Sequence, residues 1–181
     1  MNFFLQIDYE FLRWIQANRI VFLDPLFYWI SSYTFIISIM ILGFIGLFYI
    51  KNKVKSFQIK YYSLLLIFIA SSTFSLILKY IVKRPRPFVV HPAIIQLDET
   101  STFSFPSGHT SIAFTLAFSL VFFSLKKYYV ILIFIWALLV AYSRMVLGAH
   151  YVSDIVTSIL IGFMFSLLIK PISKEWIVRK T

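Results

Sequence analysis

Long apolar segments separated by mostly short polar connections dominate the chain. Hydrophobic residues run almost unbroken through five such segments. Each is about 18 to 25 residues long, which at about 1.5 Å per residue is enough to cross a hydrocarbon core of about 30 Å. The pattern therefore predicts an all-α bundle of about five transmembrane helices, with approximate bounds at residues 26–50, 61–82, 108–125, 128–147 and 152–169.

A different pattern precedes the first of these segments. Apolar side chains recur at helical spacing, with polar ones between them, at Phe3, Phe4, Ile7, Phe11 and Ile15. This amphipathic pattern is typical of a helix that lies in the membrane interface, and it fits equally a helix packed on the flank of its own protein. We predict an interfacial helix over residues 1–22 and keep flank packing as the alternative.

One connection is longer than the others. Residues 83–107 contain several prolines, polar residues and scattered hydrophobic ones, and we predict that they form a loop on the outer side of the membrane. Its only histidine, His91, is predicted to lie on the loop surface. The apolar side chains of the loop either enter the outer leaflet and line an entrance for lipid tails or simply cap the bundle: Phe88, Val89, Val90, Ile94, Ile95 and Leu97.

The composition supports the membrane interpretation. Of 181 residues, 60% are hydrophobic and only 13% are charged, whereas ordinary soluble domains are about 45–50% apolar and about 25% charged. A formal net charge of +10 would suggest nucleic acid in a soluble protein, but here we expect no nucleic-acid partner, because basic residues also mark the sides of a membrane protein. Cysteine is absent, which excludes disulfides and cysteine-ligated metals. We expect a single membrane domain over residues 1–181 and no obligate protein partner.

The distribution of Lys and Arg predicts the orientation. Ten of the 17 lie on the side that holds the first and third connections and the C-terminus, and seven lie on the other. Because cytoplasmic loops carry the excess of basic residues, we predict that residues 170–181 are a cytoplasmic tail and that the N-terminal helix and residues 83–107 lie outside. The outer cations gather near two helix ends and the long loop, as expected either for binding an anionic substrate or for snorkelling to lipid phosphates.

Three polar clusters fall at the outer ends of the predicted spans. In the first, Lys79 lies about one turn inside the end of the second span, and Arg86 stands between two prolines that hold the backbone extended. The planar fork of arginine donors suits phosphate oxygens.

The second cluster lies at the start of the third span. There Ser107 is a candidate N-cap, Gly108 allows a ligand to approach the backbone, and His109 lies in the first helical turn. Free N–H groups at such a helix start bind anions.

The third cluster covers residues 143–154. Arg144 ends the fourth span, and His150 and Asp154, four residues apart, share a helix face. A carboxylate there either fixes the tautomer of the imidazole and leaves the other nitrogen free to attack, or makes a purely structural hydrogen bond. The three clusters together contain cations, a helix N-terminus, two histidines and an aspartate, which is what phosphoryl transfer requires. The residues alone do not decide which histidine is the nucleophile, although the Asp154 partner favours His150.

The three clusters resemble the signature of the type 2 phosphatidic acid phosphatase superfamily, which includes lipid phosphatases and vanadium haloperoxidases. Its three parts, K-x6-R-P, P-S-G-H and S-R-x5-H-x3-D, are all matched between residues 79 and 154. The resemblance implies a helical phosphatase that uses no metal and no cofactor. It also implies roles for the matched residues: His150 forms a phosphohistidine, Asp154 orients it, His109 protonates the leaving oxygen, and the phosphoryl oxygens are held by Lys79, Arg86, Ser107, Gly108 and Arg144.

The small size of the chain and its residues 86–91 look most like bacterial undecaprenyl-diphosphatases. The resemblance thus implies hydrolysis of undecaprenyl diphosphate to undecaprenyl phosphate in the bacterial cytoplasmic membrane, with the site facing the periplasm or the cell exterior. Three alternatives stay open: a phosphatase for phosphatidylglycerophosphate, phosphatidate or lipid A, a lipid-to-lipid phosphotransferase, and a non-enzymatic protein that binds or transports lipid headgroups.

Overall fold

All regular secondary structure in the described part of the chain is helical, as the sequence predicts. The computed structural model describes residues 3–51, 55–99, 103–121 and 126–168. The predicted tail at residues 170–181 and the predicted ends of the third and fifth spans lie outside these ranges. The elements are α1 (Phe3–Ala17), a 3-10 helix (Val21–Leu23), α2 (Asp24–Ser32), α3 (Thr34–Lys51), α4 (Lys55–Val82), α5 (Pro87–Val90), α6 (Gly108–Val121), α7 (Lys127–Val146) and α8 (Val152–Leu167).

The prediction of one continuous helix over residues 26–50 is wrong, because the segment is broken into two helices. Val21–Ser32 and Thr34–Leu47 meet at an angle of 49° and together are long and apolar enough to cross a membrane. At the break, the Thr34 hydroxyl donates to the Ile30 carbonyl over 2.8 Å, a local bond that competes with regular helical pairing and bends helices. The segment Gln58–Val90 and α7 each suffice alone, whereas α6 and α8 are shorter apolar helices.

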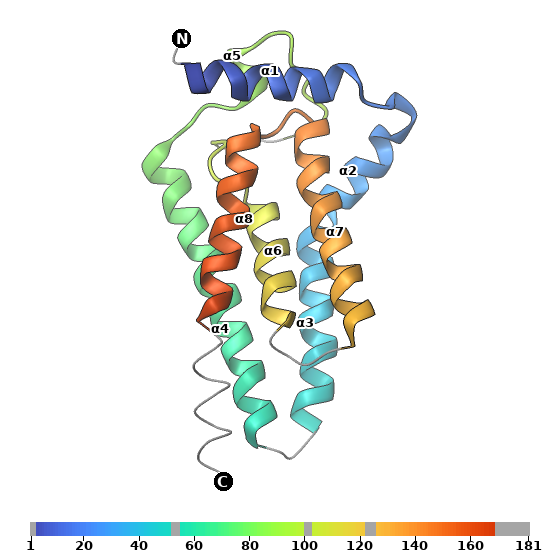
Figure 1. The fold of residues 1–181 in the computed structure, drawn as a ribbon, viewed down its shortest axis with the longest axis vertical. Coiled ribbons are helices and arrows are strands. Elements are labelled where there is room, and N and C mark those ends of the chain that lie inside the picture. The colour runs from blue at the N-terminus through green and yellow to red at the C-terminus, as the bar shows by residue number, and fades with distance from the viewer. Residues whose placement is uncertain (1–2, 52–54, 100–102, 122–125, 169–181) are drawn as a thin grey trace.

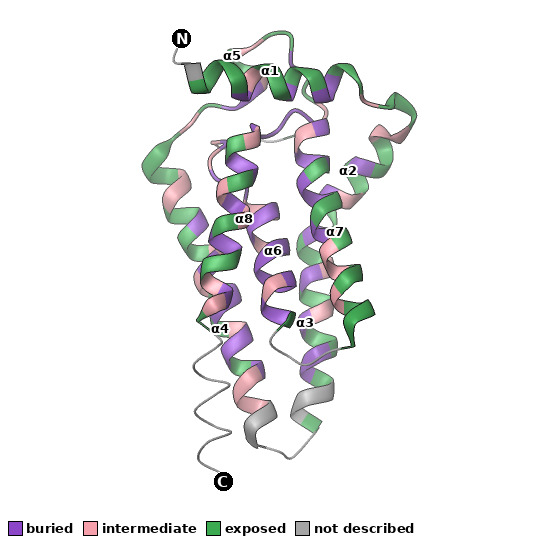
Figure 2. Cartoon of the chain, in the orientation of Figure 1, coloured by how far each residue is buried: buried purple, intermediate pink, exposed green. Residues whose placement is uncertain are grey.

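Helix α6 occupies the centre of the bundle (Figure 1), and Figure 2 shows it almost entirely buried. Its apolar side chains pack on one side against α3 and α4 and on the other against α7 and α8. Hydroxyl pairs join the buried helices, with Ser71 to Thr115 at 2.7 Å and Ser75 to Ser111 at 2.8 Å. A helix that is apolar all round is expected in such a buried position.

Helix α1 lies across the end of the bundle at which α5 is also found (Figure 1). Its Leu12 packs with Ile94 and Tyr151, so the helix covers the bundle end. Other apolar side chains of α1 remain exposed, including Phe4 at 77% and Trp14 at 62%. The packing alternative is therefore confirmed for one face, and placement of the other face in the membrane interface stays a prediction.

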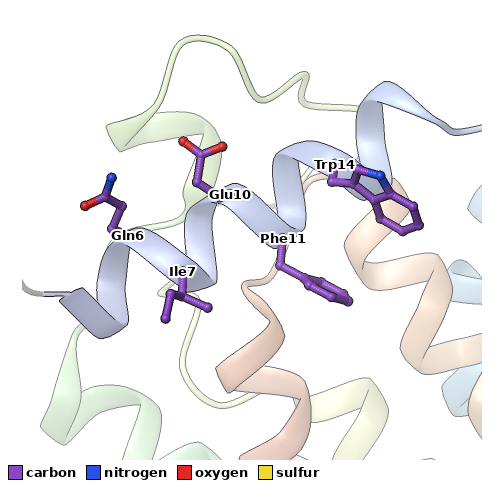
Figure 3. A pocket seen from close by; sticks show the side chains of 5 residues that line it. All are labelled: Gln6, Ile7, Glu10, Phe11 and Trp14. Atoms are coloured by element: carbon purple, nitrogen blue, oxygen red, sulfur yellow. The ribbon is translucent and has the colours of Figure 1, made fainter.

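A shallow groove follows the exposed face of α1 and is lined by Gln6, Ile7, Glu10, Phe11 and Trp14. In Figure 3, Ile7 and Phe11 project from the side of α1 nearer the bundle, and Glu10 projects from the opposite side. This division of apolar and charged side chains is the one expected of a helix at the boundary between lipid and water.

Gln16 joins α1 to the loop that contains Ile95 and to α7. Its amide nitrogen donates to the carbonyls of Ile95, over 2.8 Å, and Val146, over 3.0 Å, and its amide oxygen accepts from the Ile95 N–H. Gly148 adopts a φ of +71°, and a Cβ there would lie 2.4 Å from the Ile95 carbonyl oxygen. The loop after α7 therefore needs glycine at the point where the outer loop crosses it.

A close contact between two helix backbones gives a stability prediction. A Cβ at Gly162 in α8 would lie 2.7 Å from the Thr115 backbone nitrogen in α6, so Gly162→Ala should force the helices apart at a cost of about 1–3 kcal/mol. Gly43→Ala is the matched control because nothing lies within 4 Å of its Cβ position. We expect the unfolding midpoint in detergent to fall for Gly162→Ala only; equal midpoints would contradict this packing.

Candidate active site

The three polar clusters meet at the bundle end that α1 covers (Figure 1). The Arg86 Nη1 atom lies 3.4 Å from the His150 Nε2 atom, although the two residues are 64 positions apart in the chain. Lys79 and Arg144 stand in the last turns of α4 and α7, and Asp154 stands in the first turn of α8. Residues from distant parts of the sequence thus share one small region.

His150 lies between a cation and a carboxylate and is 2% exposed. Its Nδ1 atom faces the Asp154 Oδ2 atom at 3.6 Å, and its Nε2 atom faces the Arg86 guanidinium. Because a guanidinium only donates hydrogen bonds, this contact favours the tautomer in which Nε2 accepts and Nδ1 carries the proton. At 3.6 Å from Asp154, Nδ1 makes no hydrogen bond among the described residues. In this tautomer the lone pair lies on Nε2, which can therefore act as a nucleophile.

The charge state of His150 follows from its surroundings. Burial, followed by the positive charges of Arg144, Arg86 and Lys79 and by His109, lowers the pKa of His150 well below its ordinary value. The imidazole is therefore neutral at neutral pH, the form that a nucleophile requires. His109 is one of the groups that contribute to this lowering of the pKa.

Asp154 is fully buried, and several hydrogen-bond donors besides the neighbouring His150 hold it in place. Its Oδ2 atom accepts the Tyr151 N–H over 3.0 Å, and its Oδ1 atom accepts from Arg84 Nη1 over 2.7 Å. A carboxylate in the first turn of a helix also interacts favourably with the helix dipole. The position of this group is therefore tightly constrained.

The three predicted phosphate-binding cations already have oxygen partners in the structure. Lys79 Nζ donates to the Phe103 and Pro106 carbonyls over 2.7 and 3.0 Å. Arg86 Nη1 donates to the Ala149 carbonyl over 2.8 Å.

Arg144 is the most enclosed of these cations, at 1% exposed. Its Nη1 atom donates to the Ser31 hydroxyl and to the Asp98 Oδ2 atom, the latter over 2.5 Å. Its Nε–H is buried and has no hydrogen-bond partner among the described residues. A buried N–H of this kind gains if it donates to an anion.

The start of α6 confirms the predicted helix cap. The Ser107 hydroxyl accepts from the Thr110 N–H over 3.4 Å, which is the bond that an N-cap residue makes. Its own N–H donates to Ser158 Oγ, which in turn donates to the Asp154 carbonyl over 2.6 Å. A Cβ at Gly108 would meet nothing within 4 Å, so there is open space beside the free end of the helix.

Several residues at this end of the bundle were not predicted as parts of the site. Asp98, Arg84 and Asp8 all form ion pairs here. Arg84 lies inside the first cluster, which was a usable signal, but no spacing in the sequence connects Asp8 or Asp98 to the histidines. Among the described residues, His, Asp and Glu side chains form no group of three that could hold a metal ion.

His91 lies in the loop at intermediate exposure, and its ring packs against other aromatic side chains. Its ring stacks on Tyr9 of α1 with centroids 4.0 Å apart and meets Tyr151 edge-on at 6.2 Å. Aromatic packing between the loop and α1 takes precedence over the polarity of the imidazole. Of the apolar loop residues, Ile94 is buried in the bundle cap, whereas Val89 is 67% exposed. Entry of the exposed ones into the outer leaflet stays a prediction.

Comparison with known proteins gives a consistent family. The family model described as PAP2 superfamily matches residues 60–177. The undecaprenyl-diphosphatase of Sulfolobus acidocaldarius is 28% identical over 172 residues, covering 94% of this chain and 81% of the relative. The undecaprenyl-diphosphatase BcrC of Bacillus subtilis is 30% identical over 165 residues, covering 88% of this chain and 82% of the relative.

The fold has a solved counterpart. The crystal structure of a transmembrane PAP2 type phosphatidylglycerolphosphate phosphatase from Bacillus subtilis superposes with a TM-score of 0.77 at 24% sequence identity. The match covers 97% of this chain and 88% of that one. This likeness shows that the two chains share a fold, and the family and the apolar helices of this chain identify an integral membrane protein.

The Asp98–Arg144 pair generates a prediction about anion binding. A phosphate or vanadate ion that reaches Arg144 must meet the negative charge of Asp98. Asp98→Asn should therefore strengthen inhibition by orthovanadate by about tenfold or more, since a tenfold change needs only about 1.4 kcal/mol and unit charges about 4 Å apart interact by about 4 kcal/mol at an effective dielectric of 20. Glu99→Gln, an exposed neighbour with the same charge change, is the control. An inhibition constant for Asp98→Asn that equals the control or rises above it would refute this interpretation.

Proposed function

The chain belongs to the PAP2 superfamily and is a membrane phosphatase, and from this premise we propose that it hydrolyses undecaprenyl diphosphate to undecaprenyl phosphate. The observation that carries the reaction type is the position of His150, with one ring nitrogen toward Arg86 and the other toward Asp154. The substrate rests on the two undecaprenyl-diphosphatases, which align with nearly the whole chain.

The proposed reaction has two steps. In the first, His150 Nε2 attacks the terminal phosphorus, the bond from phosphorus to the bridging oxygen breaks, and His109 gives a proton to the departing lipid phosphate. In the second, His109 takes a proton from a water molecule, which attacks the phosphohistidine and releases inorganic phosphate. The phosphohistidine carries a positive ring that faces the Asp154 carboxylate, and this arrangement stabilises the intermediate.

The phosphoryl oxygens would be held by the cations around the nucleophile. Lys79, Arg86 and Arg144 all act electrostatically on His150, and their charge would stabilise the additional negative charge of the transition state. Ser107 and the Gly108 N–H stand at the free end of α6, which would bind a further oxygen. A diphosphate carries more negative charge than a monoester, so a site with three cations suits it well.

We further propose that the site faces the outside of a bacterial cytoplasmic membrane. The end of the bundle that holds His150 is the one that α1 and α5 occupy (Figure 1), and both belong to the side with fewer basic residues in the sequence. A substrate in the outer leaflet would then reach the site without crossing the membrane.

The direct test is phosphate release by the purified protein in detergent with undecaprenyl diphosphate, phosphatidylglycerophosphate, phosphatidate and lipid A. We expect undecaprenyl diphosphate to be hydrolysed fastest, in excess chelator, and His150→Ala and His109→Ala to lose nearly all activity because each removes a group that reacts. His91→Ala is the matched histidine control and should remain active.

Two results would contradict the proposal. Faster hydrolysis of another lipid of the panel would mean that this lipid is the substrate, and labelled phosphate found on a second lipid would indicate a phosphotransferase.

The pH dependence provides a separate check. Attack requires neutral His150 and departure requires protonated His109, so we expect a bell-shaped profile of kcat/KM. Because the pKa of His150 is lowered, its neutral form persists as the pH falls, and the acid limb should lie below the ordinary histidine value of about 6.5. A flat profile from about pH 5 to 9, with chemistry shown to limit turnover, would remove the acid role from His109.

A further inference from the structure

An ion-pair network connects α1 to the carboxylate behind the nucleophile. Arg84 Nη1 donates to Asp154 Oδ1 over 2.7 Å, and Arg84 Nη2 donates to Asp8 Oδ2 over 2.7 Å. One guanidinium thus bridges two carboxylates, one from α8 and one from the N-terminal helix. Asp8 is 7% exposed and Asp154 is fully buried, so both contacts are shielded from water.

Ser153 closes the network from the other side. Asp8 Oδ1 accepts the Ser153 N–H over 2.9 Å, which is one of the free N–H groups at the start of α8, and Asp8 Oδ2 accepts the Ser153 hydroxyl over 2.5 Å. The hydroxyl also accepts from Arg84 Nη1 over 2.6 Å. Asp8 therefore fixes the residue immediately before Asp154.

The backbone and an aromatic ring position Arg84 itself. Lys83, the residue after the end of α4, has a φ of +50°, and the chain turns there before it enters the proline-rich segment. The Arg84 guanidinium carbon then lies 3.8 Å above the Tyr151 ring, a contact that favours a cation over the face of the ring. The guanidinium is thereby held in a plane from which its two ends reach Asp8 and Asp154.

The charge balance of this network bears on catalysis. If Arg84 paired with Asp154 alone, the pair would be neutral, and the negative charge that should face His150 would be cancelled. Asp8 adds a second carboxylate to the same guanidinium, so the three groups together carry one net negative charge. That charge faces the ring when it becomes positive on bonding to phosphorus.

We propose that Asp8 and Arg84 are positioning residues for the Asp154–His150 pair, so that the N-terminal helix forms part of the active site. This inference rests on the proposed roles of His150 and Asp154. Arg84 sets where the Asp154 carboxylate lies, and Asp8 restores the negative charge that Arg84 would otherwise neutralise. Neither residue contacts the substrate, and both act through Asp154.

The test compares Asp8→Asn, Arg84→Gln and the double variant with the wild type, on the panel lipid that the wild type hydrolyses fastest. Asp8→Asn should lower kcat by about tenfold with little change in KM, as expected for an outer carboxylate that supports a catalytic imidazole. Glu10→Gln is the matched control, because Glu10 lies on α1 but is half-exposed and pairs only with Arg13 among the described residues. It should keep the wild-type kcat.

The pH profile separates this role from a purely structural one. His150 is faced by Arg86 from the outer loop, Lys79 from α4, His109 from α6 and Arg144 from α7, and by Asp154 from α8. These groups are unchanged in the variants, and so is the ionisation of the substrate. Loss of the Asp8 charge should move the acid limb to lower pH, and loss of the Arg84 charge should move it to higher pH. The double variant again leaves one net negative charge, so its acid limb should return close to that of the wild type.

The outcomes are distinguishable. Opposite shifts of the acid limb in the single variants, with recovery in the double variant, would support the proposal. Lower unfolding midpoints with unchanged kcat per folded molecule, or a change confined to KM, would overturn it. If His150→Ala itself retains activity, the proposed function fails first; if that variant is inactive while Asp8→Asn behaves like Glu10→Gln, only the present inference fails.

Discussion

The burial of charge at the end of an apolar bundle is the constraint on which the rest of this structure depends. His150, Asp154 and Arg144 are all nearly inaccessible to solvent, and an ionised group in such surroundings is costly unless opposite charges and hydrogen bonds compensate it. Asp154 is met by Arg84 and by a backbone N–H, and Arg144 is met by Asp98. The compensating groups come from loops and helix ends because only there does the chain leave the apolar interior. The cover formed by α1 follows from the same need, since it supplies a carboxylate and excludes water.

The directions of the helices bring the required charges together. Lys79 and Arg144 lie in the last turns of α4 and α7, where the helix dipole favours cations, and Asp154 lies in the first turn of α8, where it favours anions. The free N–H groups of α6 start beside them, next to the capping Ser107. Antiparallel packing of these four helices therefore brings the cations of α4 and α7 and the free N–H groups of α6 to the same end of the bundle. A phosphoryl group at that end would meet donors that are already oriented, which is the arrangement that lowers the barrier to phosphoryl transfer.

Local patterns in the sequence were sufficient to predict the helices and most residues of the site. Apolar runs predicted α4, α6, α7 and α8 because each buried or lipid-facing segment must satisfy its own backbone polar groups. The same logic missed the bend after Ser32, because a hydroxyl bond to the preceding turn is a local competitor that hydropathy does not register. It also did not predict that the His91 ring packs on a helix distant in the chain.

By itself, the sequence determined that the protein is an all-helical membrane protein and which residues carry the phosphatase signature, because both depend on short-range spacing. Only the tertiary structure decided which residues form ion pairs with the residues of that signature. The Asp8–Arg84–Asp154 connection joins residues 8, 84 and 154, and the Asp98–Arg144 pair joins the outer loop to α7. No period or spacing links such positions, because their proximity is created by the packing of whole helices, and the charges acquire their partners only when that packing excludes water.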